Sequence, residues 1–152
     1  MDERDMPVAP VGATRLQGLP SRLLSQAATR ADRIVSEGLA TRGARKWHYA
    51  VLASLDEHGP ASQATLSDRA GLYRSDLVAV LNELEEAAQV QRASDPDDRR
   101  RNVITITRKG RTQLGRLDGL VQRTQDEILN PLSAAERKEL VRLLRLLVEP
   151  PP

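Results

Sequence analysis

Three consecutive arginines, Arg99, Arg100 and Arg101, are the residues of this chain whose types and spacing most clearly suggest chemistry. Guanidinium groups keep their charge and present forked N–H donors, which match the oxygens of a phosphate group. The run follows Ser94–Asp98, whose Asp and Pro residues favour a reversal of the chain. We therefore expect a cationic loop that contacts phosphates. The simpler alternative is a solvated run of charge.

Two short segments on either side of this loop have the pattern of paired strands. Val90–Ala93 alternates apolar and polar residues, and Asn102–Thr107 does the same with β-branched Val and Ile. Two such segments joined by a turn predict an antiparallel β-hairpin with the arginines at its tip. Ala61–Ser62 is a short extended stretch that could add a third strand.

A helix-turn-helix is expected immediately before the hairpin. Gln63–Ala70 has the pattern of a short helix that ends at Gly71, and the next helix begins at Arg74 or Ser75 after a two-residue turn. Its apolar residues recur at i, i+3, i+4 and i+7. A helix followed by a basic hairpin is the plan of a winged helix, in which the helix enters a DNA groove and the hairpin contacts the backbone. The candidate DNA contacts on the outward face of this second helix are Arg74, Ser75, Asp76, Val78, Ala79 and Asn82.

Long helices with apolar stripes flank this module. They are expected at Leu19–Leu39, Ala44–Glu57, Arg108–Leu129 and after the capping box Ser133–Glu136. The winged helix can form without the first and the last two, so their Leu-rich stripes are expected to pack together and against a second copy of the chain.

The chain as a whole is predicted to be mainly α with a small antiparallel β-hairpin (α+β). Residues 1–18, which hold prolines and glycines without periodicity, are expected to be a flexible arm. Residues 19–149 are expected to form one domain, with a DNA-binding core over 60–107 and dimerisation helices over about 19–39 and 108–148.

Composition excludes several classes of function. The formal net charge is only +2, but residues 92–111 hold seven basic against three acidic residues, which concentrates positive charge around the hairpin. The absence of cysteine excludes disulfides, thiol catalysis and cysteine-ligated zinc. The chain has no apolar run of the roughly 18 residues that a membrane span needs, and its N-terminus does not resemble a secretory signal. We therefore expect a cytoplasmic protein.

The order of these features resembles the MarR (multiple antibiotic resistance regulator) family. The resemblance covers about residues 19–149 and rests on Leu84-Glu85-Glu86, Val90, Arg92, Asp95-Pro96-Asp97-Asp98-Arg99-Arg100 and Ile106-Thr107-Arg108-Lys109-Gly110. It implies a dimeric winged-helix regulator, usually a repressor on a pseudo-palindromic operator in double-stranded DNA, often released by a small ligand. By the same resemblance, Arg99 and Arg100 would reach the minor groove or its phosphates, and Asp98 would hold a wing arginine by a charge-assisted bond.

The chain departs from the family's usual pattern at two places. Ala88 and Gln89 stand where the family usually has Gly and Leu, so a differently shaped turn is expected before the hairpin. Val78 and Ala79 stand where Thr and Arg often occur, which removes polar base contacts. Two ways of reading bases remain open: apolar contact with thymine methyls, or contacts from Arg74, Ser75, Asp76 and Asn82 together with DNA shape.

Other functions find less support in the residues. His48 and His58 are ten residues apart, too far for two ligands on one helical turn, so no metal or other cofactor is expected. Trp47, His48 and Tyr49 could line a ligand crevice, although packing in the core or at the dimer interface is the simpler interpretation of Trp47. No nucleophile–histidine–carboxylate set or phosphate-binding Gly-rich loop is evident, so an enzyme is not expected. The main alternative to DNA binding is a winged-helix module that contacts an acidic protein.

Overall fold

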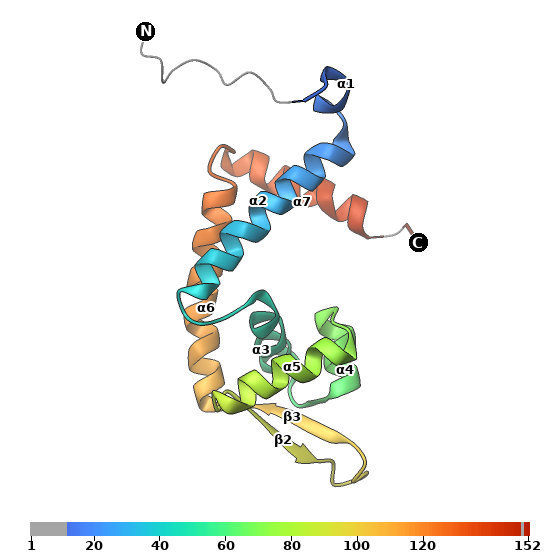
Figure 1. The fold of residues 1–152 in the computed structure, drawn as a ribbon, viewed down its shortest axis with the longest axis vertical. Coiled ribbons are helices and arrows are strands. Elements are labelled where there is room, and N and C mark those ends of the chain that lie inside the picture. Colours follow the sequence, from blue (N-terminus) through green and yellow to red (C-terminus); the bar gives the residue numbers. More distant parts are fainter. Residues whose placement is uncertain (1–11, 150) are drawn as a thin grey trace. The chain divides into compact units, whose positions relative to one another are not determined.

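The computed structural model describes residues 12–149 and 151–152. It divides into two units, Met1–Arg33 and Ile34–Pro152, and the boundary falls within a helix. The described elements, labelled in Figure 1, are α1 (Thr14–Gln17), α2 (Pro20–Ala40), α3 (Lys46–His58), β1 (Ala61–Ser62), α4 (Gln63–Ala70), α5 (Arg74–Glu86), β2 (Val90–Ser94), β3 (Asn102–Ile106), α6 (Arg108–Ile128) and α7 (Ala134–Val148).

The first unit contains α1 and most of α2. The predicted arm, residues 1–18, falls mainly on residues 1–11, which lie outside the described residues. Within the rest of that stretch, Thr14–Gln17 forms the single-turn helix α1, which ends at Gly18. Helix α2 begins at Pro20, where the missing N–H of proline costs no helical hydrogen bond.

The sheet of the second unit has three antiparallel strands in the order β1–β3–β2. Val90 lies opposite Ile106 and Ser94 opposite Asn102, so the pairing runs the full length of the hairpin. Ala61 pairs with Ile104, which confirms the third strand expected at Ala61–Ser62. The hairpin projects beyond α5 and α6 in Figure 1, with its turn at the far end.

The core of the second unit lies where α3, α4, α5, α6 and the sheet meet. Helix α5 contributes one apolar stripe to this core, and the sheet contributes alternate residues of β3. The largest fully buried side chains are Leu39, Leu52, Leu55, Leu66, Leu77, Leu81, Ile104, Leu117, Val51 and Val90. Burying this apolar surface fixes the orientation of α5, so its opposite face must point to solvent.

Side-chain caps set the helix boundaries that the sequence predicted. The hydroxyl of Ser62 accepts the N–H of Thr65 at the start of α4, and Gly71 ends that helix with φ 67°. Ser133 and Glu136 form the expected capping box at the start of α7. Because these caps depend on local sequence, the ends of α4 and α7 could be predicted well.

The turn between α5 and β2 is left-handed at Ala88, whose φ is 59°. The N–H of Ala88 donates to the carbonyl of Glu85 at 2.9 Å, and the N–H of Gln89 donates to the carbonyl of Leu84 at 2.9 Å. Thr107 holds the same turn from the other side, because its hydroxyl donates to the carbonyl of Ala88 at 2.7 Å. Alanine at this position therefore does not prevent the left-handed conformation that glycine favours.

Helix α7 buries little of its apolar surface within the chain. Leu146, Leu147 and Val148 are 65–78% exposed, and Val141, Leu143 and Leu144 are 36–44% exposed. In the first unit, Leu16, Leu19, Leu23 and Leu24 are 38–50% exposed. Each unit therefore presents apolar residues that its own packing leaves uncovered.

Candidate nucleic-acid interface

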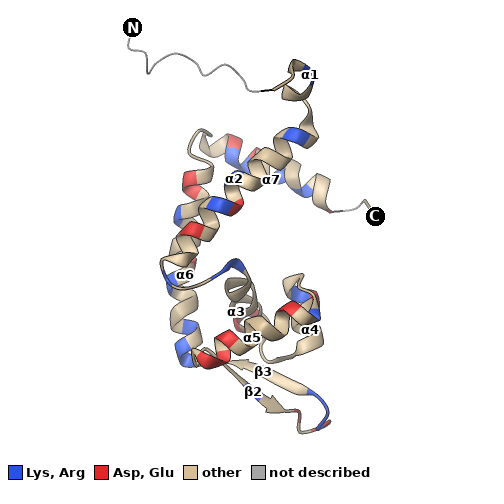
Figure 2. Cartoon of the chain, in the orientation of Figure 1, with Lys and Arg blue, Asp and Glu red and all other residues tan. Residues whose placement is uncertain are grey.

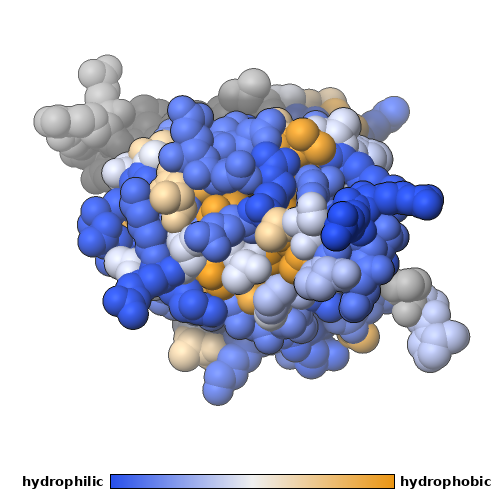
Figure 3. Space-filling model, turned by 90° about the horizontal axis from the view of Figure 1, so that it is seen from below, coloured by the Kyte–Doolittle hydropathy of each residue, from blue (hydrophilic) through white to orange (hydrophobic). Residues whose placement is uncertain are grey.

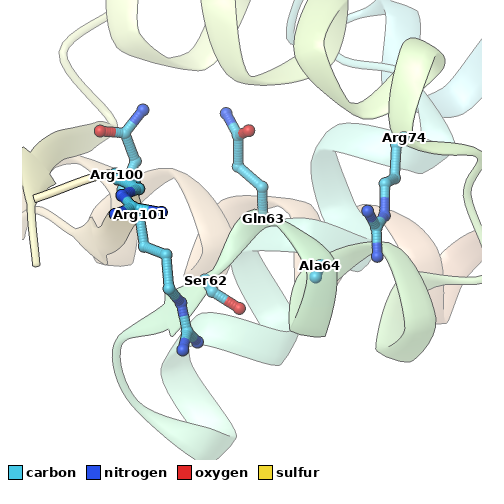
Figure 4. Close-up of a pocket in the computed structure, with 7 residues that line it drawn as sticks. Ser62, Gln63, Ala64, Arg74, Arg100 and Arg101 are labelled. Atoms are coloured by element: carbon cyan, nitrogen blue, oxygen red, sulfur yellow. The ribbon is translucent and has the colours of Figure 1, made fainter. Parts of the chain in front are cut away.

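A cationic cleft lies between the N-terminus of α5 and the wing, the loop and strands formed by Val90–Ile106. It has a volume of about 260 Å³. Arg74 lies on one side and Arg101 on the other, with Ser62, Gln63 and Ala64 from the start of α4 between them (Figure 4). Arg100 and Asn102 complete the lining. Residues that the sequence placed on two separate elements, Arg74 and the wing arginines, thus meet around one opening.

The tip of the wing is ordered by its own backbone and acidic side chains. The N–H of Asp95 donates to the carbonyl of Arg101 at 2.8 Å, and the N–H of Arg101 donates to the carbonyl of Asp98 at 3.0 Å. The carboxylate of Asp98 accepts the backbone N–H of Arg100 at 3.0 Å. Asp98 therefore braces the loop through a main-chain amide, whereas the resemblance implied a bond to a guanidinium group.

The side chains of the wing arginines are exposed. Arg99, Arg100 and Arg101 form no ion pair with the carboxylates of residues 12–149. In Figure 2 the loop between β2 and β3 is marked by these basic residues. Figure 3, seen from the wing end, shows a mostly hydrophilic face around a small apolar area. Free guanidinium groups at a projecting tip are suited to neutralise phosphates.

The outward face of α5 carries the predicted contact residues. Leu77, Val80, Leu81 and Leu84 are buried, whereas Arg74, Ser75, Asp76, Val78, Ala79 and Asn82 are exposed. The sequence did not single out Tyr73, the residue that caps α5, whose side chain is 81% exposed beside Arg74. The sequence indicates this exposed side chain only by placing an aromatic residue directly before the predicted helix.

Arg92 of β2 joins the wing to α5. Its Nε donates to Glu85 at 2.7 Å, and its Nη2 donates to the side-chain oxygen of Asn82. The Arg92 side chain is 22% exposed, so the guanidinium group is held against the helix. Asn82 was predicted as a base contact, and the structure shows that its oxygen already has a partner within the chain.

A second link joins α5 to the start of α3. One guanidinium nitrogen of Arg45 donates to both carboxylate oxygens of Glu83, at 2.6 and 2.7 Å. The backbone N–H of Arg45 donates to Nδ1 of His48 at 2.9 Å, so Nε2 of that ring carries the proton and donates to Glu83 at 2.7 Å. The hydrogen bond from Arg45, followed by the one from His48, lowers the pKa of Glu83.

One of the three residues predicted to line a ligand crevice, His48, lies at a small cavity. A cavity of about 90 Å³ is lined by His48 and Glu83 together with residues that include Gln89 and Gln113. Tyr49 points elsewhere, because its hydroxyl donates to Asp118 of α6 at 2.8 Å. Burial, followed by this hydrogen bond, raises the pKa of Tyr49 to about 12. Trp47 packs partly buried against the core, with the ammonium group of Lys46 4.8 Å from its ring centre.

The described residues show neither a cation site nor a membrane span. Across residues 12–149, no three His, Asp or Glu side chains gather as metal ligands would. His48 is buried and bonded as described above, and His58 lies exposed at the end of α3. None of the described helices is long and apolar enough to cross a bilayer.

Known regulators of transcription share this architecture. The model of the MarR family matches residues 47–101, which run from α3 to the wing. The structure is similar to that of the transcriptional repressor CouR bound to a 23-mer DNA duplex, with a TM-score of 0.84 and 26% identity over 93% of this chain and 100% of that chain. Residues 47–101 therefore match the MarR family. The order of the chain's helices and its wing thus correspond to those of a winged helix-turn-helix regulator.

Two further proteins are similar to this chain over different shares of its length. A protein named for regulation of the hcr operon in Thauera aromatica is 34% identical over 107 residues, which are 70% of this chain and 64% of that relative. The match thus spans just under two thirds of that relative's length. The PcaV transcriptional regulator from Streptomyces coelicolor, solved with its natural ligand, has a TM-score of 0.77 and 25% identity over 91% of this chain and 97% of that one.

Proposed function

We propose that this chain is a dimeric, sequence-specific DNA-binding regulator of transcription, acting as a repressor on a pseudo-palindromic operator in the cytoplasm. The observation that carries the proposal is the cleft of about 260 Å³ at which Arg74 of α5 faces Arg100 and Arg101 of the wing. Such a cleft can hold a phosphate of the backbone while α5 lies in the adjacent major groove. The chain then acts by binding and performs no catalysis.

The charges on α5 support this orientation. The C-terminal half of the helix holds Glu83, Glu85 and Glu86, and carboxylates repel phosphates unless they are paired. Arg45 neutralises Glu83, and Arg92 neutralises Glu85. Arg74 and the arginines of the wing tip form none of these ion pairs, so positive charge on this face is available to phosphates at the start of α5 and on the wing.

Dimer formation is proposed from the uncovered apolar residues of α7 and of the first unit. Leu146 and Leu147 are 65% and 69% exposed, which is costly for a lone chain in water. A second copy that covers them would set two recognition helices about 34 Å apart on B-DNA. Light scattering should give the mass of a dimer, and Leu146→Glu with Leu147→Glu should give a monomer that loses most operator affinity.

The test of DNA binding is a salt series on short duplexes, read by fluorescence anisotropy. Replacing Arg99 and Arg100 with Ala should weaken binding to all duplexes and reduce the slope of log K against log salt by about 2 for each protomer. Arg116→Ala with Arg123→Ala, which removes the same charge from α6, is the matched control and should leave the slope unchanged. Unchanged binding in the wing variant would refute the assignment of the wing.

The same series separates DNA binding from the alternative of an acidic protein partner. A protein-binding module would show no salt-dependent affinity for duplex DNA, and selection from a random duplex pool would return no palindrome. Relief of repression by a small ligand is proposed by analogy with PcaV, which was solved with its natural ligand. It would be measured as a ligand-dependent rise in the Kd for the selected operator.

A further inference from the structure

We propose that Arg92 determines base specificity by holding the side-chain oxygen of Asn82, so that Asn82 offers chiefly its NH₂ group to the major groove. The inference rests on the proposed function, because it concerns how α5 reads DNA. The guanidinium group of Arg92 has donors and no acceptor, so the Asn82 atom that faces Arg92 must be the oxygen. The amide is planar, and its NH₂ group therefore points away from the wing.

Arg92 is itself held in place. Its Nε donates to Glu85 at 2.7 Å, three residues after Asn82 on the same helix. Its backbone lies in β2, opposite Ile104 of β3, which is fully buried. A guanidinium group tied to a strand at one end and to a helix carboxylate at the other has little freedom to release the Asn82 oxygen.

Asn82 is on the face of α5 that is directed away from the core. The buried residues Leu77, Leu81 and Leu84 lie on the opposite side of the helix, and Asn82 shares the exposed side with Ser75 and Ala79. Because Val78 and Ala79 carry no hydrogen-bonding group, Asn82 is the amide on this face that can read a base edge. Whether its oxygen already accepts a hydrogen bond within the protein therefore affects which base it can recognise.

An asparagine usually recognises adenine by accepting from N6–H with its oxygen and donating to N7 with its NH₂ group. The contact with Arg92 uses one lone pair of that oxygen and places a positively charged donor beside it, which disfavours a second donor such as the amino group of adenine. Both purines offer the acceptor N7, so the discrimination lies at position 6, where guanine presents the acceptor O6 and adenine presents a donating amino group. Asn82 is therefore predicted to prefer guanine over adenine at the base that it faces.

The experiment begins with selection of a bound operator by the full-length protein. Asn82→Ala identifies the base pair whose preference depends on this side chain. At that position, guanine should be preferred over adenine by about fivefold or more, and 2-aminopurine, which keeps N7 but lacks O6, should lose most of this preference. In Arg92→Met, which keeps the length of the side chain but removes its donors, the freed oxygen should shift the preference toward adenine.

Two controls keep the outcomes distinct. Thermal unfolding of Arg92→Met shows whether the wing still folds, and the comparison of guanine with 2-aminopurine on the unmodified protein does not depend on that variant. Failure to select any operator would overturn the proposed function and this assignment with it. A selected operator at which Asn82→Ala changes no base preference, or at which adenine is preferred by the unmodified protein, would overturn the assignment of Asn82 and Arg92 alone.

Discussion

Replacing Ala88 with Gly should stabilise the protein. Ala88 has φ 59°, which places its methyl group close to a backbone oxygen, and this conformation costs an L-residue roughly 1–2 kcal/mol. The side chain is exposed, so its removal loses no packing. Glycine adopts the same φ without the clash, but it adds about 0.4–1 kcal/mol of entropy to the unfolded chain.

The net change follows from these two terms. Ala88→Gly should raise the free energy of unfolding by about 0.5–1 kcal/mol, which for a chain of this size raises Tm by about 1–4 °C. Glycine should leave the hydrogen bonds of the turn in place, because they use only the backbone of residue 88 and the hydroxyl of Thr107. Affinity for DNA should not change, since the substitution leaves Asn82 and the wing arginines untouched.

Gly71 supplies the matched control. Its φ is 67°, and a Cβ placed on it would meet no atom within 4 Å. Gly71→Ala therefore introduces the left-handed strain without a steric contact and should lower the free energy of unfolding by about 0.5–1 kcal/mol. Urea unfolding at one fixed protein concentration measures both variants. Destabilisation by Ala88→Gly, as expected for glycine within a regular helix, would refute the argument from strain.

Three further predictions concern contacts between elements. A Cβ on Gly110 would lie 2.1 Å from the carbonyl oxygen of Gln89, so Gly110→Ala should lower the free energy of unfolding by about 1–3 kcal/mol. Gly115→Ala, in open space on the same helix, should raise it by about 0.5–1 kcal/mol in the same urea assay. Equal effects of the two substitutions would contradict the close approach of α6 to Gln89. Tyr49 should ionise near pH 12 in an ultraviolet titration of the Tyr73→Phe variant, and Asp118→Asn should lower this pKa. The pKa of Tyr49 is higher in the folded than in the unfolded chain. Its stabilisation of the folded state is therefore present below pH 10 and is lost as the pH rises toward 12. The pKa of Glu83 is lowered in the folded state, so its contribution to the free energy of unfolding is present above its usual pKa near 4.5 and is lost as the pH falls through the folded pKa. Glu83→Gln should therefore flatten the acid side of a plot of stability against pH. An unchanged acid side would show that the ion pair with Arg45 does not stabilise the fold.

Local chemistry explains why so much of the fold could be predicted from the sequence. Gly71 ends α4 and Thr107 begins α6, and each acts through hydrogen bonds to residues within a few positions of itself. The hairpin was predictable for the same reason, since its alternation and its turn residues are contiguous. The sequence located the wing arginines correctly at the tip, although their part in DNA binding stays a prediction.

Contacts between distant residues could not be predicted in this way. Trp47, His48 and Tyr49 are consecutive, and neighbouring residues of a helix point about 100° apart, so each contacts a different part of the structure. The bond of His48 to Glu83 spans 35 positions, and that of Tyr49 to Asp118 spans 69. Both depend on how α3 packs against α5 and α6, which no local pattern specifies.

The same limit applies to the recognition helix itself. From the sequence, the amide of Asn82 was expected to be free, and Arg92 was expected to be a strand residue whose charged group is in solvent. Ten positions separate them, and only the packing of α5 on β2 brings the guanidinium group to the amide oxygen. A base-reading residue is thus defined by its partner inside the protein as well as by its own type. Two chains with the same outward residues on this helix would read different bases if one lacked an arginine at the position of Arg92.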